Sequence, residues 1–390
     1  MLNQGLIKKN TTMSTNESKF IFTRYLYIKD EVRVALLVSI LNKSEKSLFW
    51  AYELYYSGFD AELFTFLWKI YFDFYYTLNP GFYKYFIKKQ KEWSKVKDSF
   101  EKHKTIGVIV NNLLIRPHNM DVFLLRQIVR NFEIETETET ETETETDFTM
   151  KISKWLDQRN YLNIADYIFN KCSSATALNS SIQQMTNYFK ERNVKVGESE
   201  KNVGLDQKHF ALANVMLMFS HAQKLTMGKN LYLIVEDEEI LKYNTMESDY
   251  DKSFYPYKIL PLVTKHAIDE ENYLSLFALQ REIIDLKTAY YYHWDYYAFG
   301  SPVWKERVET FKGHANHTTK RLDFPDDDYF EDFYNKYNYE PDEQSSETQN
   351  KNIQPIRQER TWKQFYEEHK KNGLYVPDEE YLEDFDKVNY

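Results

Sequence analysis

The scarcity of glycine and proline is the feature that most restricts how this chain can fold. It contains only ten glycines and nine prolines in 390 residues, whereas the two types together make up roughly 12% of an average protein. Because these residues are the strongest breakers of regular structure, a chain with so few of them favours long helices joined by short connections. The sequence therefore predicts a mainly α-helical protein.

Aromatic residues are the second unusual feature of the composition. They make up 17% of the chain, with 32 tyrosines and 27 phenylalanines. Aromatic side chains bury large areas, and a buried tyrosine hydroxyl still needs a hydrogen-bond partner. Thick interfaces between helices and wide contact surfaces for partners are both consistent with this composition. An AT-rich coding sequence is a third explanation, since Asn, Lys and Ile are abundant as well.

Changes of composition along the chain predict its domain organisation. Residues 135–146 are six consecutive Glu-Thr dipeptides, which contain no residue that could join a hydrophobic core. We expect a disordered N-terminus (1–20), a basic aromatic helical domain folded as a bundle or an irregular α-solenoid (21–132), an acidic linker (133–148), a second helical domain (149–300) and a partly ordered acidic C-terminal tail (301–390).

The charges are distributed unevenly over these parts. The formal net charge is −10 for the whole chain, but it is +8 for residues 1–132, −10 for 133–300 and −8 for 301–390. A basic region joined to an acidic remainder suggests that the two parts dock on each other, or that the basic region binds an anionic partner.

A predicted helix from about Gly81 to Lys104 carries the most informative pattern in the basic region. Its aromatic residues fall on one face, and these are Phe82, Phe86, Trp93 and Phe100. Five lysines fall on another face, roughly 200° away, and these are Lys84, Lys88, Lys91, Lys95 and Lys102. The lysines would form a stripe about 27 Å long.

Such a lysine stripe allows several interpretations. Regularly spaced ammonium groups can neutralise phosphates and release counterions, but lysine has no forked geometry for reading bases. A nucleic acid would therefore be contacted through its backbone. Another acidic partner, the acidic tail of the same chain and a simple solvated helix face are the alternatives.

Two further places could carry chemistry. Glu53 lies in a strongly aromatic segment, where a carboxyl group could have a raised pKa and act as an acid or base; an ion pair with Lys or Arg is the alternative. His293 and Trp294 could stack on a base, although aromatic residues at helical spacing more often belong to a core.

Motifs for metal or nucleotide chemistry are weak. His314 and His317 have a spacing compatible with a metal, but they lie in a predicted loop and have no second ligand motif. The chain has no phosphate-binding loop, dinucleotide fingerprint or nucleophile elbow. We therefore expect no cofactor, no metal and no catalytic residues, and we do not expect an NTPase or a nucleotide-dependent oxidoreductase.

Two local structures and the cell compartment complete the predictions. The apolar run at residues 231–237 is the best strand candidate, although no partner strand is evident, and a long helix is expected from Asp269 to about Phe299. Cys172 is the only cysteine, which favours the cytosol or nucleus. No signal-peptide core and no run of about 18 apolar residues is present, so neither secretion nor membrane insertion is expected.

Two segments resemble proteins of giant (nucleocytoplasmic large) DNA viruses that infect algae and protists. They are ALLVSILNKSEKSLFWAYELYYSGFDAELFTFLWKIYFDFYYTLNP and SPVWKERVETFKGHANHTTKRLDFPDDDYFEDFYNKYNYEPDEQ, and the resemblance covers about residues 24–130 and 300–345. The similar proteins carry no established activity, so the resemblance assigns no functional residue. It implies the host cytoplasm, a viral factory or a virion as the location.

These observations lead to a ranked expectation of function. We expect a non-enzymatic interaction or structural protein of a large DNA virus, which acts as a helical scaffold in a multiprotein assembly through aromatic helix surfaces. The alternative is an accessory replication or transcription factor that contacts nucleic-acid backbone through the lysine stripe. An enzyme with a dispersed site is the third class.

Overall fold

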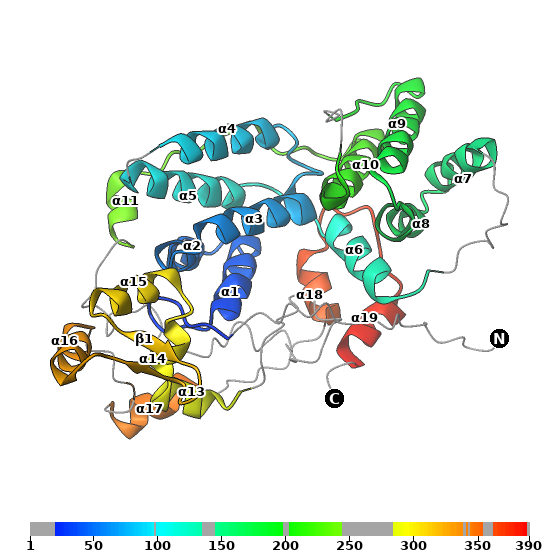
Figure 1. The fold of residues 1–390 in the computed structure, drawn as a ribbon. Helices are drawn as coiled ribbons and strands as arrows, with labels where there is room; N and C mark the ends of the chain where they lie inside the picture. Colours follow the sequence, from blue (N-terminus) through cyan, green and yellow to red (C-terminus); the bar gives the residue numbers. More distant parts are fainter. Residues whose placement is uncertain are drawn as a thin grey trace.

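The computed structural model is mainly α-helical, which confirms the predicted fold class (Figure 1). It describes residues 20–96, 99–134, 145–197, 203–243, 284–337, 341, 344–353 and 362–387. Among these residues, no helix combines the length and the apolar character that a membrane span requires. The predicted disordered N-terminus lies outside the described residues except for Phe20, which is buried.

Six helices and a π-helical turn form the first third of the chain. They are α1 (Lys29–Leu41), α2 (Lys46–Tyr56), α3 (Asp60–Ile70), η1 (Tyr71–Tyr75), α4 (Phe82–Lys95), α5 (Ser99–Leu114) and α6 (Asp121–Asn131). Short connections join several of these helices. Gly58, for example, adopts a φ of 89° just after α2, a conformation that glycine reaches without a steric penalty.

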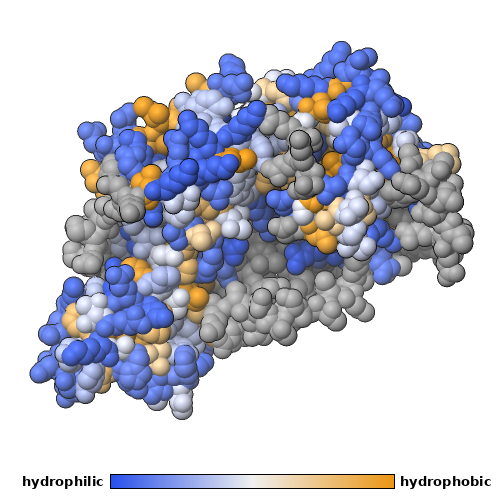
Figure 2. All heavy atoms as spheres, turned by 45° about the horizontal axis from the view of Figure 1, so that its top comes forward, coloured by the Kyte–Doolittle hydropathy of each residue, from blue (hydrophilic) through white to orange (hydrophobic). Residues whose placement is uncertain are grey.

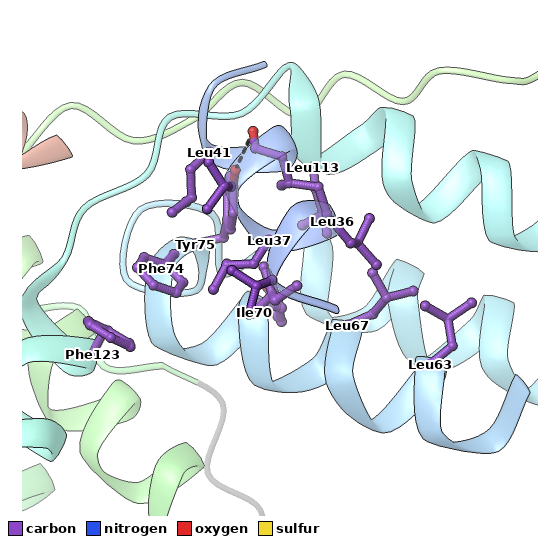
Figure 3. Close-up of a cluster of buried hydrophobic side chains, with 14 of the residues drawn as sticks. Leu36, Leu37, Leu41, Leu63, Leu67, Ile70, Phe74, Tyr75, Leu113 and Phe123 are labelled. Atoms are coloured by element: carbon purple, nitrogen blue, oxygen red, sulfur yellow. Dashed lines mark hydrogen bonds between the residues drawn. The ribbon is translucent and has the colours of Figure 1, made fainter. Parts of the chain in front are cut away.

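The core of this region forms where the apolar faces of the helices meet. Leu36 and Leu37 of α1 lie against Leu67 and Ile70 of α3 (Figure 3). Tyr75, which is fully buried, directs its hydroxyl to the backbone carbonyl of α1 at Ile40, 3.5 Å away. The Tyr75 hydroxyl thus finds a partner inside the core, as the burial of this residue type requires.

The helices that follow α6 pack on the first group and on one another. They are α7 (Glu145–Asp157), α8 (Tyr161–Asp166), η2 (Tyr167–Lys171), α9 (Ala175–Glu191), η3 (Leu205–Gln207), α10 (Lys208–Ala222) and α11 (Asp237–Leu241). Phe210 of α10 stacks on Tyr83 of α4, with ring centroids 5.6 Å apart, and Asn214 accepts a hydrogen bond from the Tyr76 hydroxyl at 2.6 Å. Buried residues from before and after the tract therefore belong to one hydrophobic core.

The C-terminal elements are short. They are α13 (Leu286–Tyr292), α14 (Trp294–Ala298), α15 (Pro302–Thr310), β1 (His314–Asn316), β2 (Arg321–Asp323), α16 (Asp327–Tyr337), α17 (Ser346–Ile353), α18 (Trp362–His369) and α19 (Glu379–Lys387). The strands form an antiparallel hairpin in which Ala315 pairs with Leu322. Trp304 anchors α15 to the start of the chain, because its indole N–H donates to the Thr23 carbonyl at 3.2 Å.

The predicted helix from Gly81 to Lys104 is wrong in one respect, because it is two helices. α4 ends at Lys95, and Val96 has extended backbone angles (φ −72°, ψ 131°). The chain then reverses, so that α5 lies beside α4 (Figure 1). This reversal lets Ile106 and Val110 of α5 join the core, which a single straight helix could not achieve. Phe100 lies where side chains are not described.

Three other local predictions also differ from the structure. Residues 231–236 form no strand, and α11 begins at Asp237. The described part of the long helix expected up to Phe299 is divided at His293 (φ −138°, ψ 19°) into α13 and α14; residues 269–283 lie outside the described residues. The predicted loop at His314 and His317 contains strand β1. Segment 231–236 is held by distant residues, since Asn112 bonds to Leu233. The His293 ring shares a hydrogen bond with the Lys320 carbonyl at 2.7 Å, whereas strand β1 pairs with its neighbour β2 in a local hairpin.

Candidate functional site

Helix α4 is held to the molecule by its predicted aromatic face. Phe86 stacks on Trp68 of α3 with ring centroids 3.8 Å apart and planes 7° from parallel. Trp93, one turn from the end of α4, packs on Phe64 at 4.6 Å. The face opposite these rings must therefore point to solvent, because α4 is amphipathic and is seated on one side only.

Four of the five predicted lysines lie on that outer face. Lys84, Lys88, Lys91 and Lys95 are exposed, and together with Ile87 and Glu92 they line a shallow hollow of about 340 Å³ along the helix. We call these four residues the α4 lysine stripe. It is about 16 Å long at 1.5 Å per residue. In Figure 2, which turns this side of the molecule towards the viewer, hydrophilic residues cover most of the surface.

The α4 lysine stripe is only partly neutralised. Glu92 lies 3.7 Å from Lys88 and 2.9 Å from Lys89, and the hydrogen bond from Lys89 is the largest cause that lowers the pKa of the Glu92 carboxyl. Within the described part of the chain, Lys91 and Lys95 form no ion pair. The C-terminal half of the stripe therefore keeps its positive charge.

Lys102 does not belong to this surface. It lies on α5, where its ammonium group sits over the ring of Trp93, 5.3 Å from the centroid. The acidic tail does not cover the stripe either as far as it is described, because α18 and α19 lie on the other side of the molecule from α4 (Figure 1). The acidic helix α11 comes closer, and its Asp237 pairs with Lys104 of α5 at 2.8 Å.

The segment 229–236, which includes most of the strand predicted at residues 231–237, crosses α5 beside α4. Asn112 of α5 takes the place of a partner strand: its side-chain amide donates to the Leu233 carbonyl at 2.8 Å and accepts the Leu233 N–H at 3.0 Å. Arg116, one turn later, donates to the Leu231 carbonyl at 2.8 Å. One side chain of α5 and one from just beyond its end thereby replace the backbone hydrogen bonds that a neighbouring strand would supply.

Arg116 was missed by the sequence interpretation. Its guanidinium lies over the Phe82 ring at 4.1 Å and over the Tyr232 ring at 5.4 Å, and burial is the largest cause that lowers its pKa. No helical spacing in α5 marks Arg116, because it lies two residues beyond the end of the helix at Leu114.

The outer side of segment 229–236 exposes apolar side chains. Ile234 is 75% exposed and Leu231 is 55% exposed, whereas Val235 is buried against Gly107 of α5. Tyr232, which lies between them in the chain, is 39% exposed. No hydrogen bond to the backbone of Ile234 is made by any described residue. We call Leu231, Tyr232 and Ile234 the apolar strip.

Most aromatic residues of the helices lie inside the protein rather than on its surface. The largest fully buried side chains include Tyr52, Tyr71 and Phe74. Among the described residues, the exposed large aromatic side chains are Tyr232, Tyr292 and Phe330. Most of the aromatic side chains of the described helices are therefore used in the core.

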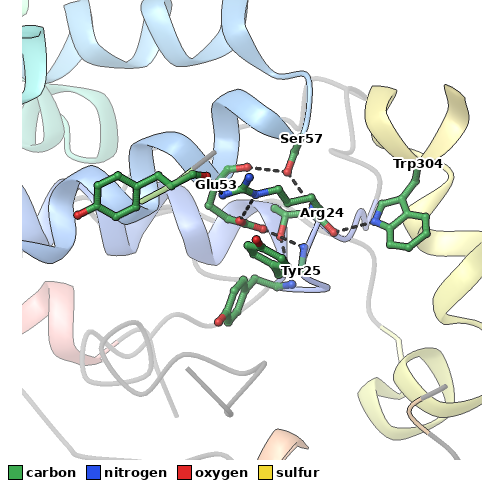
Figure 4. A network of polar contacts seen from close by, with 8 residues as sticks. Arg24, Tyr25, Glu53, Ser57 and Trp304 are labelled. Atoms are coloured by element: carbon green, nitrogen blue, oxygen red, sulfur yellow. Dashed lines mark hydrogen bonds and ion pairs between the residues drawn. The ribbon is translucent and has the colours of Figure 1, made fainter. Parts of the chain in front are cut away.

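Glu53 takes part in a buried ion pair, the alternative that the sequence left open. It is fully buried, and it accepts hydrogen bonds from the Arg24 guanidinium at 2.9 Å and from the Tyr25 N–H at 3.0 Å (Figure 4). Arg24 lies over the rings of Tyr25 and Tyr56, 4.5 and 4.6 Å from their centroids. The carboxylate is fully occupied in joining the N-terminal segment to α2.

The remaining candidates are also engaged in structural contacts. His317 shares a hydrogen bond with the Tyr296 hydroxyl at 3.0 Å, and His314 lies 4.0 Å from Asp323 across the hairpin. No group of three or more His, Cys, Asp or Glu that could hold a metal occurs among the described residues. Trp294 is buried, and its ring centroid lies 5.4 Å from that of Trp304. It therefore belongs to the core, which was the alternative to stacking on a base.

Comparisons with protein-family models, with curated proteins and with solved structures find no match to the chain.

Proposed function

We propose that this protein is a non-enzymatic interaction protein that binds an extended segment of a partner protein along the apolar strip. The observation that supports this proposal is the half-satisfied backbone of segment 229–236. In an extended chain, alternate residues direct their N–H and C=O groups to opposite sides. Leu231 and Leu233 bond inward to Arg116 and Asn112, so the Ile234 groups face outward, where an added strand would pair.

The side chains of the strip favour the same kind of partner. Two exposed aliphatic residues beside an open backbone edge are a liability for a protein that stays alone. Strand addition would cover the apolar side chains and satisfy the backbone in one step. Following the resemblance described above, we propose that the assembly belongs to a large DNA virus in the host cytoplasm or viral factory.

The test is affinity purification of the tagged protein from infected cells, with and without nuclease, followed by mass spectrometry. We expect a set of protein partners that survives nuclease, is lost in Ile234→Asp and is retained in Met150→Asp, a matched control because Met150 is equally apolar and exposed on α7. Ile234→Pro removes the backbone N–H and should weaken binding more than Ile234→Ala. Retention of all partners in Ile234→Asp would contradict the proposal.

The α4 lysine stripe supports a second candidate, an accessory factor that contacts nucleic-acid backbone. Lys91 and Lys95 are exposed and have no acidic partner among the described residues. Each phosphate contact changes the logarithm of affinity by about −0.9 per tenfold rise in salt. Removal of two contacts should therefore reduce the salt slope by about 2.

Fluorescence anisotropy with DNA and RNA over a range of salt concentrations tests this second candidate. We expect Lys91→Glu with Lys95→Glu to abolish most of the binding, and Lys305→Glu with Lys363→Glu, two exposed lysines elsewhere, to leave it largely intact. Equal losses in both double variants would mean that the binding depends on net charge and not on the stripe.

A further inference from the structure

Four basic side chains converge where α3, η1, α6 and α10 pack together. Asp73 of η1 binds Arg126 of α6 through both carboxylate oxygens, at 2.7 and 3.1 Å, and both side chains are almost fully buried. Lys69 lies one turn before Asp73, near the end of α3, and Arg130 lies one turn after Arg126 on α6. His209, the second residue of α10, completes the group. We call Lys69, Arg126, Arg130 and His209 the α3–α6 basic cluster.

Asp73 is the acidic residue that acts on this cluster, because its charge acts to raise the pKa values of Lys69 and His209. Burial acts to raise the pKa of the Asp73 carboxyl, but Arg126, His209 and Lys69 outweigh burial and the pKa is lowered. Arg126 occupies both carboxylate oxygens. At neutral pH, one negative charge therefore faces the positive charges of Lys69, Arg126 and Arg130.

Lys69 and Arg130 are the uncompensated members of the cluster. Neither forms an ion pair with a described residue. Burial, followed by repulsion from Arg126, lowers the pKa of Lys69 to about 8, and Arg33 and Arg130 act in the same direction. The pKa of Arg130 is lowered by burial and by Arg126. Both side chains have exposed surface, so water reduces this repulsion and leaves a route for a ligand.

His209 adds a polar group without a partner. Its Nε2 atom is buried and has no hydrogen-bond partner among the described residues, while the ring contacts Phe169 edge-on at 5.4 Å. Burial is the largest cause that lowers the pKa of His209 to about 4, and Arg126, Lys69 and Arg130 also lower it. The imidazole is therefore neutral at pH 7, and a buried polar atom of this kind calls for a partner.

We propose that the α3–α6 basic cluster is a binding site for a small phosphate-class anion, held between Lys69 and Arg130 with Arg126 and His209 behind it. A dianion balances the excess positive charge that Asp73 leaves. Its tetrahedral oxygens can accept hydrogen bonds from an ammonium group, from a guanidinium fork and from an imidazole N–H at the same time. This site is separate from both the apolar strip and the α4 lysine stripe.

Thermal unfolding with inorganic phosphate, at constant ionic strength adjusted with chloride, tests the proposal. At about 100-fold excess over the dissociation constant, the midpoint should rise by roughly 3–5 °C. Lys69→Met with Arg130→Met should abolish this rise and should raise the midpoint without phosphate, because the repulsion is removed. Lys91→Met with Lys95→Met, the control on α4, should respond like the wild type.

Histidine NMR provides a second readout that does not depend on stability. Phosphate should shift the His209 ring resonances and raise the pKa of His209, since a bound anion favours the imidazolium form. An unchanged midpoint and unchanged His209 resonances in the wild type would overturn the proposal. So would a phosphate response that persists in the Lys69→Met, Arg130→Met double variant.

Discussion

Individual polar residues in this protein act mainly by satisfying buried partners. The ion pair of Arg24 and Glu53 shows this most clearly, because neither charge reaches water to any extent and each also bonds to backbone groups. A buried ion pair contributes little beyond the cost of its own desolvation, but removal of one partner leaves an uncompensated charge in the core. The pair therefore makes folding sensitive to either residue.

We expect Glu53→Gln to lower the free energy of unfolding by about 3–5 kcal/mol, because the Arg24 charge remains buried without its partner. Urea unfolding monitored by circular dichroism measures this loss. Arg24→Met combined with Glu53→Leu should cost less than Glu53→Gln alone. Lys305→Met, which breaks an exposed pair with Glu309, serves as the control and should change stability by less than about 1 kcal/mol. A similar small effect of Glu53→Gln would show that the pair is dispensable.

At the scale of elements, side chains of one element complete the hydrogen bonding of another. Segment 229–236 is neither helix nor strand, yet its inner backbone groups are paired because Asn112 offers an amide with the same donor and acceptor pattern as a peptide. Gly107 of α5 leaves room for the Tyr52 hydroxyl, since a Cβ atom there would lie 2.7 Å from that oxygen, whereas Val235 would be in ordinary contact with it at 3.4 Å.

Asn112→Ala should release segment 229–236 from α5 and lower the free energy of unfolding by about 1–3 kcal/mol, because two backbone groups lose their partner. Hydrogen exchange read by mass spectrometry should show faster exchange in residues 229–236, with little change in α9. Asn187→Ala, which removes an exposed side-chain bond to Gln183 on α9, is the control. Unchanged exchange in 229–236 would mean that Arg116 alone holds the segment.

For the whole molecule, the C-terminal segment closes the fold against α6. The carboxylate of Asp121 accepts the N–H groups of Leu374 at 3.0 Å and Tyr375 at 3.1 Å, and the rings of His118 and His369 lie 5.6 Å apart. Burial raises the pKa of Asp121 to about 6, although the two backbone hydrogen bonds oppose it. Burial and then His369 lower the pKa of His118 to about 4.

These shifts give opposite pH dependences. The Asp121 pKa is raised on folding, so its contribution to stability is present below about pH 4 and is lost as the pH rises through 6. The His118 pKa is lowered on folding, so its contribution is present above about pH 6.5 and is lost as the pH falls through 4. Asp121→Asn removes only the first of these contributions.

We therefore expect the stability of Asp121→Asn, relative to wild type, to increase by up to about 3 kcal/mol between pH 4 and pH 7. Urea unfolding at pH 4, 5.5 and 7 measures the difference. Asp157→Asn, at an exposed carboxylate on α7, should show a much smaller change over the same range. A difference that stays constant with pH would mean that Asp121 titrates normally in the folded protein.

The sequence by itself determined the helical class and the amphipathic nature of α4. The scarcity of glycine and proline and the spacing of Phe82, Phe86 and Trp93 act through neighbours within one or two helical turns. Such local preferences can be deduced from the order of residues in the sequence. The exposure of Lys84, Lys88, Lys91 and Lys95 follows from the same spacing.

Only the tertiary structure decided which distant residues meet. The chain reverses after Lys95, which removes Lys102 from the lysine stripe, because burial of α5 outweighs continuation of the helix. Asn112 replaces a partner strand for Leu233, more than a hundred residues later, and the α3–α6 basic cluster draws its side chains from three separate packed elements. Such contacts depend on how apolar faces pack, and no local spacing in the chain encodes them.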